Sequence, residues 1–273
     1  EVQDHNSQRV GHWVKPKPGM RVIDACAGAG GKSLHMAALM ENKGQIIALD
    51  IFPKKLEELK RRARRSGAHN IETRLIESRK TIKKLYQKAD AVLIDAPCTG
   101  IGVLKRNPDA KWKLTPEFLT EITQVQKEIL NDYSSMVKPG GSLVYATCSI
   151  LPQENQLQIQ AFLKSEEGED FSLEAQESLL PSVTGYDGFF MARLRASVFL
   201  SCSATQTFFC LNLELFVPLP SFFKDSEPMN VSHTIDAKNN GVITVAIAQA
   251  DTQQTDTYYI VAHFHYVIFG GGV

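Results

Sequence analysis

Short apolar runs alternate with amphipathic segments along the chain from about Met20 to Leu194. The apolar runs are as long as buried strands, and the segments between them have the length and periodicity of helices. We predict strands at 21–25, 45–50, 71–76, 90–95 and 142–147, and helices at 32–40, 53–66 and 115–137. This alternation predicts an α/β fold, a doubly wound and mainly parallel sheet with helices on both faces. Such a sheet binds ligands at the carboxyl ends of its strands.

The overall charge does not point to a nucleic-acid partner, because 30 lysines and arginines balance 30 aspartates and glutamates. The basic residues are nevertheless grouped into two runs, at 54–65 and 79–88. Each run is either a solvated helix face or a surface for a phosphate backbone, and the sequence leaves both interpretations open.

The five cysteines show no zinc-type spacing, so we predict no metal site. The sequence contains no signal peptide and no uncharged apolar stretch long enough to span a bilayer. We therefore expect no membrane partner and a cytoplasmic location, where a reducing environment keeps thiols free.

A glycine-rich segment, Asp24–Ser33, joins the first predicted strand to the first predicted helix. Its glycines let the backbone turn tightly and let a ligand approach closely. A Walker phosphate loop would need glycine where Cys26 stands, and the dinucleotide-binding spacing fails at Ser33. Asp50 ends the second strand, where an acid receives a ribose diol, and ribose without a pyrophosphate site favours S-adenosylmethionine. The alternative is that Asp50 caps the next helix.

Two cysteines follow neighbouring strands of the predicted sheet. The fourth strand leads into Asp95-Ala-Pro-Cys98, and the fifth leads into Ala146-Thr-Cys148. A single cysteine is most often a small buried apolar residue, but two at adjacent strand ends would face the same crevice. We therefore expect both sulfurs at the ligand-binding edge of the sheet.

Two thiols beside a methyl donor suit the methylation of cytosine at carbon 5. That carbon is too electron-poor to attack a sulfonium methyl directly, but a thiolate that adds at carbon 6 makes an enamine whose carbon 5 can attack. The carbon-5 proton must then leave and the enzyme–base bond must break, which a second thiol can assist. We expect Asp95 to bond the base and Lys32 to pair with Asp95 or with developing charge.

Several motifs make residues 1–195 similar to the Sun/RsmB-type family of S-adenosylmethionine-dependent RNA (cytosine-5) methyltransferases. They are Val2-Gln3-Asp4, Ser7-Gln8, Asp24 to Lys32, Asp95 to Gly100, Lys138 to Gly141, Tyr145 to Ser149 and Asp187 to Ala192. The resemblance implies a Rossmann-like class I methyltransferase fold, with Cys148 as nucleophile and Cys98 assisting release. DNA cytosine methyltransferases attack with a Pro-Cys cysteine and lack the second one, so the pair favours RNA.

The resemblance also implies a set of cofactor-binding residues. They are Cys26, Ala27, Gly28, Ala29, Gly30, Gly31, Lys32, Asp50, Glu77 and Asp95. Glu77 stands where aspartate is commoner in the family, and we expect it at the adenine edge. The loop 105–112 resembles the family's substrate-side loop, in which Arg106 would contact phosphate and Trp112 would either stack on a base or pack in the interior.

RNA is the partner that the resemblance implies, ribosomal RNA first and transfer RNA second, and we expect a monomer. Family members carry an RNA-binding extension before the Val-Gln-Asp motif, and we expect this sequence to lack it. Two other functions stay open. One is an amino-group methyltransferase on nucleic acid or protein, although Ala96 and Cys98 do not fit its Asp-Pro-Pro-aromatic motif. The other is a truncated fragment that binds cofactor or RNA without turnover.

Residues 196–273 do not continue the family and are expected to form a separate, irregular and poorly packed tail, of fusion or artefactual origin. Its last thirty or so residues, which contain His263-Phe-His265, resemble a fragment of haem–copper oxidase subunit I. The His-Phe-His histidines of that family bind haem, but Thr255 stands here in place of a further histidine. We therefore predict no metal function and place the two histidines on one face of a strand.

Overall fold

The computed structural model describes residues 2–198, 232–234 and 244–246. By its internal contacts the chain divides into two units, 1–200 and 201–273. In the second unit, β8 (Ser232–Thr234) and β9 (Thr244–Ala246) pair antiparallel. The predictions made for the haem-like histidines and for the packing of the tail lie outside the described residues.

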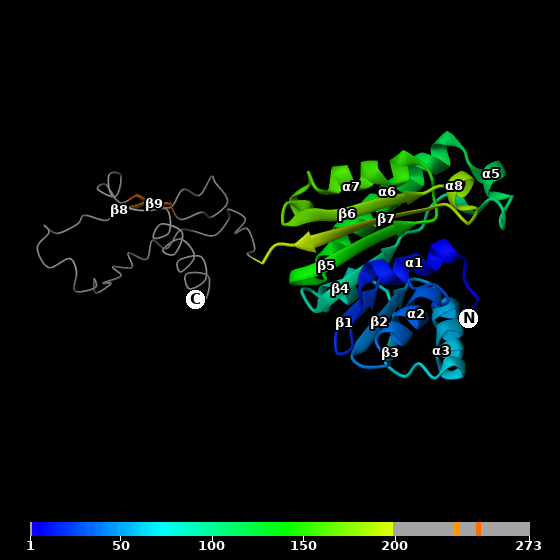
Figure 1. Ribbon diagram of the computed structural model, residues 1–273, viewed down its shortest axis with the longest axis horizontal. Helices are drawn as coiled ribbons and strands as arrows, with labels where there is room; N and C mark the ends of the chain where they lie inside the picture. Colours follow the sequence, from blue (N-terminus) through cyan, green and yellow to red (C-terminus); the bar gives the residue numbers. More distant parts are fainter. Residues whose placement is uncertain (1, 199–231, 235–243, 247–273) are drawn as a thin grey trace, which may run out of the picture. The chain divides into compact units, whose positions relative to one another are not determined.

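The first unit is built on a seven-stranded sheet with the strand order β3-β2-β1-β4-β5-β7-β6 (Figure 1). Its strands are β1 (Arg21–Asp24), β2 (Gln45–Asp50), β3 (Ile71–Leu75), β4 (Ala89–Asp95), β5 (Val137–Thr147), β6 (Phe171–Leu179) and β7 (Phe189–Ala196). The first five strands pair in parallel, and β7 runs antiparallel to both of its neighbours. The predicted α/β fold with a mainly parallel sheet is confirmed.

Helices cover both faces of this sheet. They are α1 (His5–Val14), α2 (Gly31–Leu39), α3 (Pro53–Ser66), α4 (Arg79–Lys83), α5 (Ala110–Lys113), α6 (Pro116–Ser134), α7 (Gln156–Phe162) and α8 (Pro181–Thr184). Successive residues of β1 point to opposite faces, so Val22 packs with α1 and α2 while Ile23 packs with α4, α6 and α7. None of the described helices is both long enough and apolar enough to cross a membrane.

The sequence misplaces the junction between α6 and β5. The helix ends at Ser134, and the strand begins at Val137, which we had assigned to the helix. Val137 pairs with Ala89 of β4, and the register then shifts before Ser142 pairs with Ala91. The segment 138–141 lies within this irregular start of the strand, where Gly140 has φ +72°, a backbone conformation that favours glycine.

A buried carboxyl group links the end of β1 to α2. Asp24 Oδ2 accepts a hydrogen bond from Ser33 Oγ at 2.6 Å, whereas its Oδ1 finds no partner among the described residues. Burial raises the pKa of Asp24 to about 7, although the bond from Ser33 opposes the rise. The carboxyl group is therefore neutral in the folded protein at mildly acidic pH.

Leu59 is a test of the packing between α3 and the sheet, because its side chain is fully buried among Ala27, Leu34, Ala48 and Ala63. Leu59→Ala should lower the free energy of unfolding by about 2–5 kcal/mol through lost burial and the cavity it leaves. Urea denaturation measures the loss. Lys60→Ala, on the exposed side of the same helix, is the matched control and should change stability by less than about 0.5 kcal/mol.

Asp24→Asn tests whether the buried carboxyl group is neutral. The folded pKa of Asp24 is about 7 and its ordinary value is 3.8, so its contribution to stability is present below pH 3.8 and is lost as the pH rises through 7. Between pH about 4 and about 8, wild-type stability should fall relative to that of Asp24→Asn by on the order of 4 kcal/mol. Urea denaturation across this range would contradict the assignment if the difference did not depend on pH.

Candidate active site

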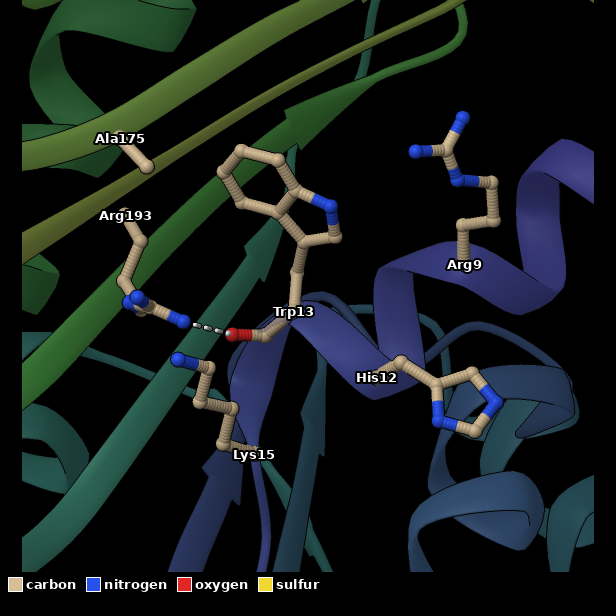
Figure 2. Close-up of a pocket in the computed structure, with 6 residues that line it drawn as sticks. All are labelled: Arg9, His12, Trp13, Lys15, Ala175 and Arg193. Carbon is tan, nitrogen blue, oxygen red and sulfur yellow. Dashed lines mark hydrogen bonds between the residues drawn. The ribbon is translucent and has the colours of Figure 1, made fainter.

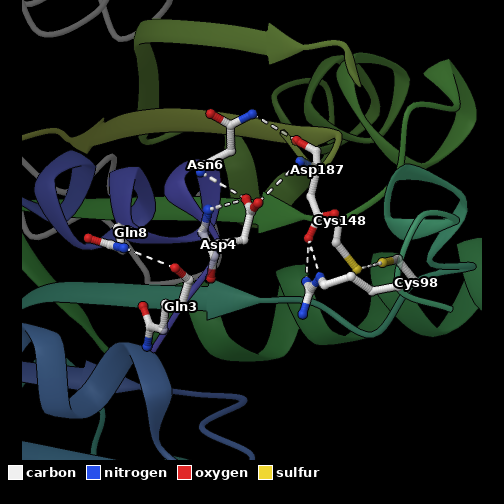
Figure 3. A network of polar contacts seen from close by, with 9 residues as sticks. Gln3, Asp4, Asn6, Gln8, Cys98, Cys148 and Asp187 are labelled. Carbon is white, nitrogen blue, oxygen red and sulfur yellow. Dashed lines mark hydrogen bonds and ion pairs between the residues drawn. The ribbon is translucent and has the colours of Figure 1, made fainter. Parts of the chain in front are cut away.

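The two cysteines meet because β4 and β5 run parallel and in register. Their pairing sets Asp95 opposite Ala146, and Cys98 and Cys148 follow within three residues. The two sulfurs lie 3.2 Å apart and share a hydrogen bond (Figure 3). Both side chains are partly buried. The structure thus brings into contact the two sulfurs that the sequence assigned to neighbouring strand ends.

The surroundings make the two thiols unequal. The pKa of Cys148 is lowered, first because Cys98 donates a hydrogen bond to its sulfur, and Lys32 contributes positive charge. The pKa of Cys98 is raised by the same hydrogen bond and by burial. Burial also raises the pKa of Cys26, which lies nearby in the glycine-rich loop. The pair therefore favours a thiolate on Cys148 and a thiol on Cys98.

Lys32 and Asp95 form an ion pair at the carboxyl edge of the sheet. Lys32 Nζ lies 2.6 Å from Asp95 Oδ2, and the side chains are 14% and 28% exposed. Burial acts against the charge of Lys32, but Asp95 raises its pKa through both its charge and its hydrogen bond. Lys32 also lies over the ring of Phe189, 5.6 Å from the ring centroid. The ion pair therefore fixes the positive charge of Lys32 where it acts on Cys148.

Asp50 ties the glycine-rich loop to the start of α3. Its Oδ2 accepts from the Gly28 backbone N at 2.8 Å, and its Oδ1 accepts from the Phe52 backbone N at 2.8 Å. The N-cap residue of α3 is Phe52, and no side chain caps this helix, so Asp50 is not the helix cap that the sequence offered as the alternative. Each carboxylate oxygen can still accept a further bond, as a ribose diol would require.

The loop itself leaves room for a ligand. Gly28 has φ +55°, and a Cβ added there would meet nothing within 4 Å. Gly30 has φ +86°, and a Cβ there would lie 2.4 Å from Leu59 Cγ, so that glycine is needed for packing against α3. The loop thus has free space beside Gly28, where a ligand can approach, and packs against α3 at Gly30.

Apolar side chains that the sequence analysis did not single out lie beside Asp50. Ile51 and Phe52 are 59% and 51% exposed. Glu77 is exposed two residues beyond β3, which pairs with β2 through Leu75 and Asp50. A carboxylate, an exposed apolar surface and a second acid at one sheet edge suit an adenosine group.

A chain of polar contacts links the loop 105–112 to the start of α1 through Asp187, and Figure 3 shows its part between Asp187 and Asp4. Arg106 Nε donates to Asp187 Oδ2 at 2.7 Å, and the Asp187 backbone N donates to Asp4 Oδ2 at 3.3 Å. Asp4 Oδ1 in turn caps α1 by accepting from the Asn6 backbone N at 2.9 Å. Trp112, for which we weighed stacking against interior packing, is 78% exposed and is therefore not a core residue.

A separate groove of about 450 Å³ lies between α1 and the strands β6 and β7 (Figure 2). It is lined by Arg9, His12, Trp13, Lys15, Ala175 and Arg193. Arg9 and Arg193 already pair with Glu177 and Glu174. None of the predicted site residues lines this groove. Within the described ranges, no three histidine, cysteine or acidic side chains are grouped so that they could hold a metal ion.

Comparisons with known proteins show the family to which the chain belongs. The model of the family described as 16S rRNA methyltransferase RsmB/F matches residues 11–195. The probable ribosomal RNA small subunit methyltransferase B of Bacillus subtilis is 35% identical over 210 residues, covering 71% of this chain and 47% of that protein. Ribosomal RNA small subunit methyltransferase B of Escherichia coli is 36% identical over 208 residues, covering 71% and 46%.

A solved structure supports the same relationship. The structure of NSun6 from Pyrococcus horikoshii with SFG is 29% identical in sequence and superposes with a TM-score of 0.65. The superposed part is 72% of this chain and 53% of the NSun6 chain. The chain spans about half the length of the curated relatives it matches. The family match begins within α1 and ends one residue before the end of β7, so it contains β1 to β6, nearly all of β7 and both cysteine loops. This chain belongs to the RsmB/F family of 16S rRNA methyltransferases.

Proposed function

We propose that this chain transfers a methyl group from S-adenosylmethionine to carbon 5 of cytosine in RNA, through a covalent bond to Cys148. The pair of sulfurs 3.2 Å apart is the observation that carries the proposal. Ribosomal RNA is the first candidate substrate, because the relatives from Bacillus subtilis and Escherichia coli are named as small-subunit ribosomal RNA methyltransferases. Transfer RNA is the second.

The reaction begins at the thiolate of Cys148. Its sulfur bonds carbon 6 of cytosine, and the electron pair of the ring double bond moves toward carbon 5 and the ring nitrogen. Asp95 accepts a hydrogen bond from the base, and the positive charge of Lys32 offsets the negative charge that develops on the ring. The 2.6 Å ion pair between these two residues supports this assignment, because it fixes both groups beside the thiols.

S-adenosylmethionine supplies an electrophilic methyl group when bound. The backbone of Cys26–Lys32 would hold it, with Asp50 at the ribose and Glu77 at the adenine edge. The open side of Gly28 and the exposed Ile51 fit such a ligand. The NSun6 structure contains SFG, an analogue of S-adenosylmethionine, which supports the same cofactor class here.

Release of the product is the task of Cys98. Once Cys148 is bonded to carbon, its charge no longer disfavours a thiolate on Cys98, which loses its proton to water. The Cys98 thiolate then takes the proton from carbon 5, and the electron pair of the broken carbon–hydrogen bond restores the double bond between carbons 5 and 6. The carbon–sulfur bond breaks with its electrons on Cys148. A thiol on Cys98 and a thiolate on Cys148 are thereby regenerated.

A second candidate is a fragment that binds cofactor or RNA without turnover. It is favoured by one observation, that the chain spans about half the length of its curated relatives. Methylation of any RNA cytosine by the purified chain would exclude it. An amino-group methyltransferase fits less well, since Ala96 stands where the Asp-Pro-Pro-aromatic motif of that class has a proline and Cys98 stands where it has an aromatic residue.

The roles of the two cysteines can be separated by substitution. With labelled S-adenosylmethionine and total RNA, Cys148→Ala should abolish the formation of 5-methylcytosine, because no thiolate activates the base. Cys98→Ala should instead accumulate a protein–RNA complex that survives denaturation, because carbon 5 keeps its proton. Cys202→Ala, which removes a thiol outside the matched residues 11–195, is the control. Full turnover by Cys148→Ala would refute the mechanism.

Asp50→Asn tests the ribose assignment. The substitution removes a charged acceptor while keeping the size of the side chain, and it should weaken S-adenosylmethionine binding by about tenfold or more. Isothermal titration calorimetry measures the affinity, and the melting temperature shows whether the loop bonds to Gly28 and Phe52 survive. Glu57→Gln, on the exposed face of α3, is the control. An unchanged affinity in folded Asp50→Asn would remove Asp50 from the cofactor site.

A further inference from the structure

Glu154 is a buried acid that no step of the methyl transfer uses. It ends the short 3-10 turn Pro152–Glu154, six residues beyond Cys148, and its side chain is inaccessible to solvent. An acid in such a position must have its oxygens satisfied by donors or it destabilises the fold. Its donors come from both cysteine loops.

The first set of contacts fixes the loop that carries Cys98. The Thr99 backbone N donates to Glu154 Oε1 at 2.8 Å, and Thr99 Oγ1 donates to Glu154 Oε2 at 2.6 Å. Gln126 Nε2 in α6 donates both to Glu154 Oε1 at 3.0 Å and to the Pro97 carbonyl at 2.9 Å. The residues immediately before and after Cys98 are therefore held.

The second set fixes the loop that carries Cys148. Ser149 Oγ donates to Glu154 Oε2. The next residue, Asn155, accepts from Thr147 Oγ1 at 2.6 Å and donates from Nδ2 to the Ser149 carbonyl at 3.0 Å. The residues on each side of Cys148 are thus held by the same turn. The buried pair Glu154 and Asn155 therefore fixes the backbone next to both cysteines.

The charge of Glu154 also acts on Cys98. The pKa of Cys98 is raised first by its hydrogen bond with Cys148 and by burial, and the negative charge of Glu154 adds to the rise. Glu154 therefore disfavours a thiolate on Cys98, the cysteine whose loop it also holds through Thr99.

We propose that Glu154 is a positioning residue for the thiol pair, which fixes Cys98 beside Cys148 and thereby sets the relative reactivity of the two sulfurs. Glu154 does not touch the substrate in this assignment. Its effect on the reaction rests on the proposed function, whereas its effect on the two thiols does not. A residue that merely stabilised the fold would change the melting temperature without changing the relative reactivity of the sulfurs.

Alkylation of the full chain by iodoacetamide, followed by mass spectrometry of the two cysteine peptides, measures that relative reactivity. In the wild type, Cys148 should react much faster than Cys98 at neutral pH, because the thiolate is the nucleophile. Glu154→Gln keeps the shape and the acceptor for the Thr99 backbone N but removes the charge. The ratio of the initial rates, Cys148 over Cys98, should fall by about tenfold, which corresponds to one pKa unit.

Two further variants make the result decisive. Gln158→Ala removes a buried side chain of α7 that donates to the Thr123 carbonyl at 2.8 Å. Among the described residues this side chain makes no hydrogen bond to either cysteine loop, so the substitution should lower the melting temperature and leave the ratio unchanged. Thr99→Val removes one hydroxyl bond to Glu154 and should lower the ratio by about threefold. An unchanged ratio in folded Glu154→Gln, or an equal fall in Gln158→Ala, would overturn the proposal. If Glu154→Gln does not fold, the ratio in Thr99→Val decides in the same way.

The alkylation requires neither RNA nor S-adenosylmethionine, so the two proposals fail separately. A chain that methylates no RNA but shows the fall in ratio loses the proposed function and keeps Glu154 as the residue that organises the thiols. A chain that makes 5-methylcytosine while its ratio is insensitive to Glu154→Gln keeps the function and loses this role for Glu154.

Discussion

The parallel pairing of β4 with β5 is the constraint on which the site depends. Because Asp95 lies opposite Ala146, the loops that leave the two strands begin side by side, and each carries a cysteine within three residues. Gly102 confirms how closely these loops pack, since its backbone N donates to the Cys148 carbonyl at 3.0 Å and its carbonyl accepts from Gly188. A shift of one residue in this register would turn the strand ends to opposite faces.

Acidic side chains, buried or partly buried, then give the site its electrostatic character, and each is accommodated differently. Burial raises the pKa of Asp24 to about 7, Asp95 is paired with Lys32, and Glu154 accepts bonds from both cysteine loops. Asp24 and Asp95 both support positive charge on Lys32. At this partly buried edge of the sheet, the charge of Lys32 and the hydrogen bond from Cys98 both favour a thiolate on Cys148. Cys98 keeps its proton, so only one sulfur is activated as a nucleophile.

The sequence predicts the fold well where local chemistry and burial agree. The helix 53–66 is correct at both ends, because Pro53 stands in its first turn and Gly67 ends it with φ +70°. The strands 45–50 and 90–95 are found to within one residue, since they are buried on both faces. The strand β6 was not predicted, because it exposes most of its residues and shows no apolar run. The strand β7 was not predicted either, although its first four residues are apolar and buried.

The site was predictable only in part for a related reason. Parallel topology alone brings Cys98 to Cys148, so that contact follows from the strand order. The contacts of Glu154 with Gln126 and Thr99 join residues 28 and 55 positions apart, and no local pattern indicates them. The bond from the Gly28 backbone N to Asp50 joins residues 22 positions apart, and it likewise appears only when the glycine-rich loop and the end of β2 are placed together in space.

The central claim is that Cys148 bonds carbon 6 of a cytosine in RNA. RNA in which cytosine is replaced by 5-fluorocytosine tests it most directly, because fluorine at carbon 5 cannot leave as a proton and the adduct cannot be resolved. After incubation with S-adenosylmethionine, we predict that mass spectrometry of the digested complex finds the modified base on the peptide that contains Cys148. A modified base on the Cys98 peptide would contradict the assignment of the nucleophile, and the absence of any adduct from a chain that methylates cytosine would contradict covalent catalysis.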